Sequence, residues 1–372
     1  MKKYFYFFLF VTGLVPLFGQ IPFAGKSGIR FNVFTGHHFA ANVINKTNQS
    51  LDGKVSGFDI GLVQCGLRND SFTAIYGTPR LGLDARFINM NSTDTFGYCL
   101  ALLPTFEIEI IHRKLWSLQS KIAYGINFNT KQFNERTNFD NRAISSPVNF
   151  AFDIGLLFHT KLNAHIEVNL GAGLYHVSNG SLKMPNGGIN IVYINTGISY
   201  YPKLSIQQAY KKPNYKLTGK RLYFMGYAAF AYREQGYFNY VRRFWVFSAV
   251  NQFMFPINKL YSLGAGIDGF YDATQPLINN YTDRLADVPE YKKYYLAVGF
   301  TNRFDIGKVF IPLGIYRYVY NKAFVKEPVY IRFGLGLQLN KYFFIGSFFK
   351  GTITKDLKLQ SDFMEWCLGV RL

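Results

Sequence analysis

Residues 165–178 of this 372-residue chain read HIEVNLGAGLYHVS, and their alternation decides the fold class. Apolar side chains occupy the even positions Ile166, Val168, Leu170, Ala172 and Leu174. The odd positions hold His165, Glu167, Asn169, Gly171 and Gly173. Because successive side chains of a strand point to opposite faces, this stretch predicts a β-strand with one apolar and one polar face.

The composition extends this pattern to the whole chain. Aromatic residues make up 18% of the sequence and charged residues 17%, against roughly 25% charged residues in a typical soluble domain. Mean hydropathy is +0.01, and no apolar run beyond the first 20 residues reaches the roughly 18 residues of a spanning helix. Alternating lipid-facing and lumen-facing residues cancel in any window, so the sequence predicts an all-β, antiparallel transmembrane β-barrel.

Strand candidates recur along the chain at the spacing that such a barrel requires. In the first half they cover about 28–38, 56–66, 80–90, 96–111, 114–129, 148–159, 163–178 and 189–201. In the second half they cover about 220–233, 241–255, 259–271, 293–305, 308–320, 328–339, 341–351 and 361–372, with weaker alternation. We therefore expect about 14–16 strands.

The segment Lys203–Arg221 interrupts the rhythm and is strongly basic, which fits a short helix, a plug or a linker. We expect residues 20–202 to form one barrel portion. Residues 203–372 would add strands that either enlarge this barrel or form a second one.

Charged residues share one parity within the strand candidates. Asp84 and Arg86 alternate with apolar neighbours, as do Glu107 and Asp153. A charge that faces lipid is costly, so these faces should line a common interior where acids and bases pair. A soluble sandwich would instead turn its apolar faces inward, and this alternative remains open.

The N-terminus predicts export. Near its start the chain has the basic residues Lys2 and Lys3, and residues 4–15 are apolar. The stretch Leu17-Phe-Gly19 that follows is an acceptable cleavage site. We therefore interpret residues 1–19 as a secretory signal peptide. An anchored helix is the alternative, although the run is short and Pro16 interrupts it. Together with the barrel pattern, this predicts the cell outer membrane.

The formal net charge of +19 predicts an anionic partner. The basic residues are scattered through turns such as Lys211-Lys212 and Lys292-Lys293, without a basic helix or a zinc pattern, so nucleic acid is not expected. A basic rim on a barrel would instead attract phosphorylated glycolipid.

Cys65, Cys99 and Cys367 lie far apart and lack metal or redox spacing. We expect no metal and no cofactor.

The even, apolar row of residues 165–178 ends in His176 and Ser178, a base and a hydroxyl nucleophile. Side chains at i and i+2 lie about 6 to 7 Å apart at the backbone, so His176 can serve Ser178. Asn190 opens the following strand on its own apolar row, and hairpin pairing would bring it beside His176. A His followed by Ser-Asn-Gly at a strand end is also ordinary turn chemistry, and the residues alone leave both interpretations open.

Residues 179–188 between these strands form a turn-rich loop. Its backbone N–H groups and asparagine side chains are suited to bind an oxyanion.

The stretch HVSNGSLKMPNGGIN, residues 176–190, resembles the signature of the lipid A 3-O-deacylase (PagL) family and of related proteins called acyloxyacyl hydrolases. The resemblance implies an eight-stranded outer-membrane barrel with a Ser-His-Glu triad on its outer face, which cuts an ester-linked acyl chain from lipid A. It implies Ser178 as the nucleophile and His176 as the general base. The oxyanion donors would come from Asn186 or from Asn179 and Gly180.

Two features depart from that family. Asn190 stands where the family has its acid, so it can orient the imidazole but cannot stabilise an imidazolium by charge. About 170 further residues follow the point where the family barrel ends.

We therefore expect a serine esterase that hydrolyses an acyl chain of lipid A or a related glycolipid, with Ser178, His176 and Asn190 as catalytic residues. The alternative is a non-catalytic barrel, either a channel, because 14 to 16 strands enclose an aqueous lumen, or a glycolipid-binding scaffold.

Overall fold

The computed structural model describes residues 26–40, 52–65, 79–202, 221–235, 242–258, 260–274, 289–321, 328–353 and 359–372. The predicted signal peptide and nearly all of the basic segment Lys203–Arg221 lie outside these residues.

Sixteen strands occupy the described parts of the chain. The first eight are β1 (Lys26–Ala40), β2 (Gly53–Cys65), β3 (Arg80–Asn89), β4 (Tyr98–His112), β5 (Trp116–Asn129), β6 (Val148–Lys161), β7 (Ile166–Ser178) and β8 (Ile189–Tyr200). The second eight are β9 (Tyr223–Gln235), β10 (Arg242–Pro256), β11 (Tyr261–Asp272), β12 (Tyr294–Ile306), β13 (Val309–Asn321), β14 (Val329–Gln338), β15 (Phe343–Ile353) and β16 (Leu359–Arg371). A short 3₁₀ turn, η2 (Glu290–Lys293), precedes β12. All sixteen coincide with the predicted segments to within a few residues, which confirms the all-β fold.

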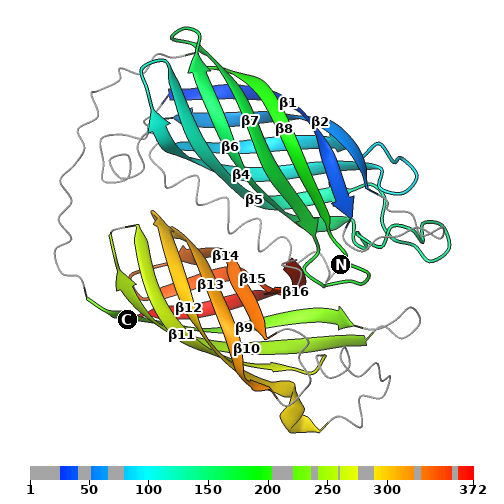
Figure 1. Cartoon of the computed structure of the whole chain (residues 1–372), viewed down its shortest axis with the longest axis vertical. Helices are drawn as coiled ribbons and strands as arrows, with labels where there is room; N and C mark the ends of the chain where they lie inside the picture. Colours follow the sequence, from blue (N-terminus) through cyan, green and yellow to red (C-terminus); the bar gives the residue numbers. More distant parts are fainter. Residues whose placement is uncertain are drawn as a thin grey trace.

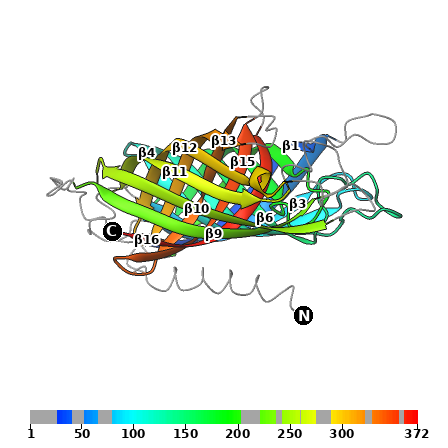
Figure 2. The same cartoon turned by 90° about the horizontal axis from the view of Figure 1, so that it is seen from below.

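The strands form two closed antiparallel barrels of eight (Figures 1 and 2). In the first barrel each strand pairs with the next along the chain, and β1 closes the sheet against β8, with Ile29 opposite Tyr200. The second barrel closes in the same way between β16 and β9. The sequence left one large barrel or two barrels open, and the structure has two.

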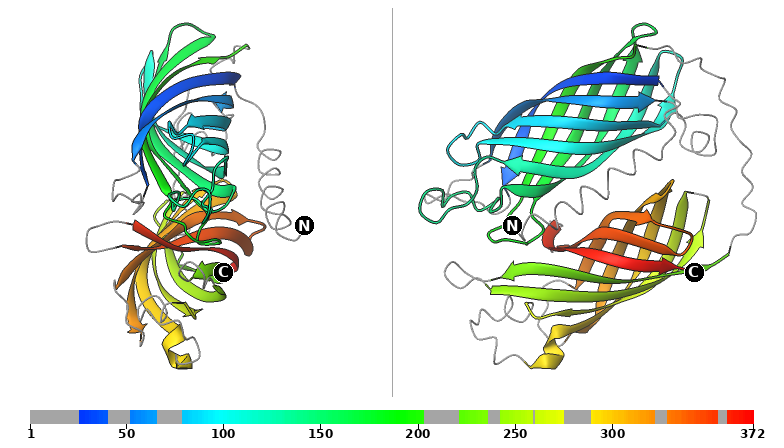
Figure 3. Two further views of the ribbon diagram at one scale, coloured as in Figure 1. Left: turned by 90° about the vertical axis from the view of Figure 1, so that its right-hand side faces the viewer. Right: turned by 180° about the vertical axis from the view of Figure 1, so that it is seen from behind.

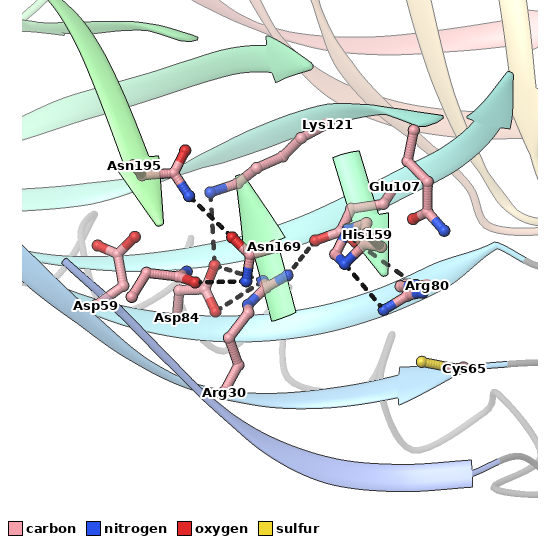
Figure 4. Close-up of polar contacts among 12 residues, drawn as sticks. Arg30, Asp59, Cys65, Arg80, Asp84, Glu107, Lys121, His159, Asn169 and Asn195 are labelled. Carbon is pink, nitrogen blue, oxygen red and sulfur yellow. Dashed lines mark hydrogen bonds and ion pairs between the residues drawn. The ribbon is translucent and has the colours of Figure 1, made fainter. Parts of the chain in front are cut away.

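Paired charges fill the interior of the first barrel (Figure 4). Arg30 lies 2.8 Å from Asp84 and also bonds Glu107, while Lys121 lies 3.1 Å from Asp153. All five side chains are at most 3% exposed. The expectation that the charged parity faces the interior is confirmed.

The outer surface carries the opposite parity. Its apolar side chains are widely exposed, for example Leu62 at 63%, Leu170 at 61% and Ile194 at 60%. This arrangement is the reverse of a soluble sandwich, so that alternative is wrong. The apolar outer face is suited to lipid.

The second barrel encloses aromatic side chains together with a smaller charged group. Arg332 bonds both Asp268 and Glu365, and Lys350 lies 3.3 Å from Asp362. An eight-stranded barrel is just wide enough for side chains to fill it. The channel alternative depended on a single wide barrel of 14 to 16 strands, whereas the described strands form two barrels of eight.

No helix among the described residues is long and apolar enough to cross a membrane.

Candidate active site

Strand β7 presents a histidine and a serine on its outward row. His176 and Ser178 share the parity of the exposed Leu170 and Leu174, whereas Tyr175 and Val177 point into the barrel and are buried. The serine Oγ lies 3.0 Å from His176 Nε2. The pairing expected from the i, i+2 spacing is therefore formed.

Strand β8 supplies the third member. The antiparallel register places Asn190 directly opposite His176, and Asn190 Oδ1 lies 2.7 Å from His176 Nδ1. A carbonyl oxygen can only accept, so Nδ1 of the neutral imidazole carries the proton. Nε2 is then unprotonated and accepts the Ser178 hydroxyl, which is the arrangement that a general base requires.

No carboxylate takes part in this chain of hydrogen bonds. Within the described residues, the partners of the His176 ring are Asn190 and Ser178. The nearest acids in sequence, Asp153 and Glu167, belong to the interior network of the barrel. The histidine is oriented without a negative charge beside it.

The loop between β7 and β8 places an amide beside the nucleophile. Asn186 Oδ1 accepts the backbone N–H of Asn179, the residue that follows Ser178, at 3.0 Å. Its Nδ2 is buried and has no hydrogen-bond partner among the described residues. A buried amide donor without a partner is costly unless something accepts from it.

The other two predicted oxyanion residues have structural partners in this loop. The side-chain amide of Asn179 donates to Ser145 Oγ at 3.0 Å and to Lys183 O at 2.8 Å. Gly180 has a φ of +62°, which favours glycine, and its carbonyl accepts from the backbone N–H of Met364. Of the three residues, Asn186 offers the free side-chain donor.

A segment before β6 anchors the loop from the first barrel. Ser145 Oγ donates to Lys183 O at 2.7 Å, and the backbone N–H groups of Gly187 and Gly188 donate to Arg142 O and Ala143 O. Sequence reasoning did not identify Ser145, because it lies more than 30 residues before Ser178 in a stretch without periodicity.

Gly188 makes room for the base. A Cβ at this position would lie 3.1 Å from His176 Cε1, and φ is +72°. Both observations favour glycine, because any side chain would press on the imidazole and strain the backbone.

The site is covered although it lies on an outward row. Ser178 is only 4% exposed, while Leu174 on the same row is 40% exposed. Figures 1 and 3 place β14, β15 and β16 on the side of the second barrel that faces the first. There Met364 of β16 lies against Gly180 and within 3.8 Å of the Tyr124 hydroxyl. The second barrel therefore covers the loop beside Ser178.

The described ranges contain no group of three or more histidine, cysteine, aspartate or glutamate side chains placed to hold a metal ion. The three cysteines are free.

Two family models match separate parts of the chain. The model of lipid A 3-O-deacylase (PagL) matches residues 88–199, and the model of the acyloxyacyl hydrolase C-terminal domain (PagL_C) matches residues 218–372. The first match covers the end of β3 and strands β4 to β8 of the first barrel, including the whole candidate site, and the second match covers the second barrel.

Solved structures with a similar barrel include the outer membrane enzyme PagL, at 18% identity and a TM-score of 0.33, over 45% of this chain and 97% of that one. Neisserial surface protein A (NspA) matches at 9% identity and a TM-score of 0.31, over 47% of this chain and 97% of that one. No curated protein matches the chain.

The two family matches together cover more than two thirds of the sequence, and they include the residues of the candidate site. With its apolar outer surfaces and closed sheets, the protein is an outer-membrane β-barrel protein. The chain belongs to the lipid A 3-O-deacylase (PagL) family, in a form that carries the acyloxyacyl hydrolase C-terminal domain as a second barrel.

Proposed function

We propose that this protein is an outer-membrane serine esterase that hydrolyses an ester-linked acyl chain of lipid A or a related glycolipid. The observation that carries the proposal is the continuous chain of hydrogen bonds from Ser178 through His176 to Asn190 on the outer face of the barrel. The match to the lipid A 3-O-deacylase family supports the choice of substrate.

The reaction begins at the Ser178 hydroxyl. Its oxygen attacks the ester carbonyl while His176 Nε2 takes the proton. The carbonyl oxygen becomes an oxyanion, and the free Nδ2 group of Asn186 is a donor suited to stabilise it. Collapse of this intermediate breaks the ester bond, and His176 returns the proton to the departing sugar hydroxyl.

Water completes the cycle. His176 takes a proton from a water molecule, whose oxygen attacks the acyl-Ser178 ester. The fatty acid leaves, and Ser178 recovers its hydroxyl proton. Each half-reaction uses the same base, so neither a metal nor a cofactor is required.

Asn190 acts by orientation in this scheme. Its Oδ1 holds the Nδ1–H tautomer and keeps Nε2 aimed at Ser178. An amide cannot stabilise the imidazolium as a carboxylate does, so turnover should be slower than with an acid at this position.

The strand connections support a place for the site at the outer leaflet. On the side of Ser178, the connections are residues 41–52, 90–97, 130–147 and 179–188. At the other end of the first barrel, two of the three connections are short, namely residues 113–115 and 162–165. The third connection, residues 66–79, is longer. External loops of outer-membrane barrels are generally the longer ones, so Ser178 would lie at the depth of the ester region of outer-leaflet glycolipid.

Lipid A extracted from cells tests the proposal. Cells that express the wild-type protein should contain lipid A lighter by one acyl chain, whereas cells that express Ser178→Ala or His176→Ala should keep the full mass. Ser146→Ala removes a hydroxyl that bonds Val148 O and Asn149 outside this loop, and as the matched control it should resemble the wild type. Identical acylation with wild-type protein and Ser178→Ala would refute the esterase.

A glycolipid-binding scaffold without turnover is the second candidate, and Asn190 is the observation that favours it. Such a protein would retain lipid A through several washes without changing its mass. Binding with unchanged acylation in the same cells would select this candidate.

A further inference from the structure

A carboxylate of the second barrel lies where an outer-membrane barrel normally presents apolar groups to lipid. Glu234 in β9 has the outward parity of Phe230 and Tyr232, opposite to the inward Arg233. It is nonetheless only 4% exposed. A buried acid on the outward row is costly unless the surrounding groups compensate its charge.

The loop of residues 179–188 in the first barrel, the catalytic loop, supplies groups that compensate the Glu234 carboxylate. Glu234 Oε2 accepts the backbone N–H of Met184 at 3.0 Å, and the backbone N–H of Glu234 donates to Ser181 O at 2.9 Å. One residue thus makes two hydrogen bonds, with its side chain and its main chain, to the loop of residues 179–188.

A cation balances the charge of Glu234 from the same barrel. Arg243 Nε and Nη2 both lie 2.8 Å from Glu234 Oε1. The two carboxylate oxygens therefore have different partners. Oε1 accepts from the Arg243 guanidinium, and Oε2 accepts from the backbone N–H of Met184 in the loop. The arginine side chain is 49% exposed and reaches solvent or headgroup.

The part of the loop that Glu234 bonds is close in sequence to the unpaired amide donor of Asn186. Met184 is two residues before Asn186, whose Oδ1 accepts from Asn179 N and whose Nδ2 has no partner among the described residues. Met364 of β16 adds a third tie through the carbonyl of Gly180. The loop is thus held by the second barrel on one side and by Ser145 of the first barrel on the other.

We propose that Glu234 is a positioning residue for the reaction at Ser178, and that the second barrel completes the active site by clamping the loop that carries Asn186. This inference rests on the proposed esterase function. Oxyanion donors act only within a narrow range of distance, and a displacement of about 1 Å costs up to about 100-fold in rate. A loop attached to one barrel alone would sample positions outside that range.

Two readouts on the purified full-length protein test this inference. The first is the release of fatty acid from purified lipid A in detergent micelles, which gives kcat and KM. The second is hydrogen exchange of the peptide that spans residues 179–188, measured without substrate. Exchange in strands of both barrels verifies that each variant is folded.

Glu234→Ala should lower kcat about 10- to 100-fold with little change in KM, because the substrate still binds but the oxyanion donor is misplaced. In the same variant, the amide hydrogens of the loop peptide should exchange several-fold faster. Glu234→Gln keeps a carbonyl oxygen for the Met184 N–H, while Arg243 can turn to solvent, so it should retain most of both properties. Glu290→Ala removes an acid that is paired with Lys293 far from the loop, and as the matched control it should resemble the wild type.

Three outcomes would overturn the inference: unchanged kcat in Glu234→Ala, a lower kcat without faster loop exchange, or faster loop exchange without a lower kcat. If the wild-type protein released no fatty acid, the proposed function would fail by itself, and loop exchange in Glu234→Ala would still decide whether the clamp exists.

Discussion

At the scale of single residues, the site depends on three side chains whose spacing the sequence already contains. Ser178 and His176 are two residues apart on one strand, and Asn190 lies directly opposite His176 on the next. The hydrogen bonds of 3.0 and 2.7 Å follow from strand geometry, since paired residues and i, i+2 neighbours share a face. Alternation and hairpin pairing were therefore sufficient to predict the arrangement.

Position 190 offers the sharpest test at this scale. Asn190→Glu should raise kcat about 10-fold, because a carboxylate keeps the imidazole oriented and also stabilises the imidazolium by charge. Asn190→Leu has similar size but no acceptor, and it should lower kcat by about 100-fold or more. Steady-state release of fatty acid measures both. Equal activity in Asn190→Leu and the wild type would show that orientation by Asn190 has no part in turnover.

At the scale of strands and loops, the prediction succeeded where the pattern was periodic and failed where it was not. All sixteen strands were predictable because side chains alternate between lipid and lumen. The residues that anchor the catalytic loop were not predictable from the sequence. Ser145 precedes β6 in an irregular segment, and Glu234 lies in a strand whose alternation is weak. Parity distinguishes inside from outside, but it carries no information on which outward residues meet another part of the chain.

The loop anchor in the first barrel gives a prediction at this scale. Ser145 is fully buried, and its hydroxyl accepts from Asn179 and donates to Lys183 O. Ser145→Ala leaves both groups without this partner, at a cost of about 1 to 3 kcal/mol, and should lower kcat several-fold. The neighbouring Ser146→Ala is the control, since Ser146 bonds Val148 O and Asn149 rather than the loop. Equal kcat values in the two variants would contradict the anchoring role.

At the scale of the whole molecule, the described strands form two barrels of eight strands each. Each has an interior filled with its own side chains, so the chain gains a second outer surface rather than a wide pore. The second barrel contacts the loop of residues 179–188 on the face of the first barrel on which the site lies. The sequence could not reveal this contact, because the two surfaces are joined by residues far apart in the chain.

The interior charges should govern the stability of the first barrel. Arg30 pairs with Asp84 and Glu107, and all three are at most 1% exposed. Arg30→Ala leaves two buried carboxylates without this partner and should lower the free energy of unfolding by about 3 to 5 kcal/mol. Urea titration in lipid vesicles measures this change, with the exposed Arg136→Ala as the control. Similar unfolding free energies for the two variants would refute the structural role of the interior network.

The central claim is that Ser178 is required to cleave the ester between its acyl carbon and the sugar oxygen. Its most direct test is the purified protein with lipid A in water enriched in ¹⁸O, followed by mass spectrometry of the products. We predict that the wild type releases one fatty acid that carries a single ¹⁸O atom from the water, and that Ser178→Ala releases none. Equal release by the two proteins, or ¹⁸O in the sugar hydroxyl instead of the fatty acid, would contradict it.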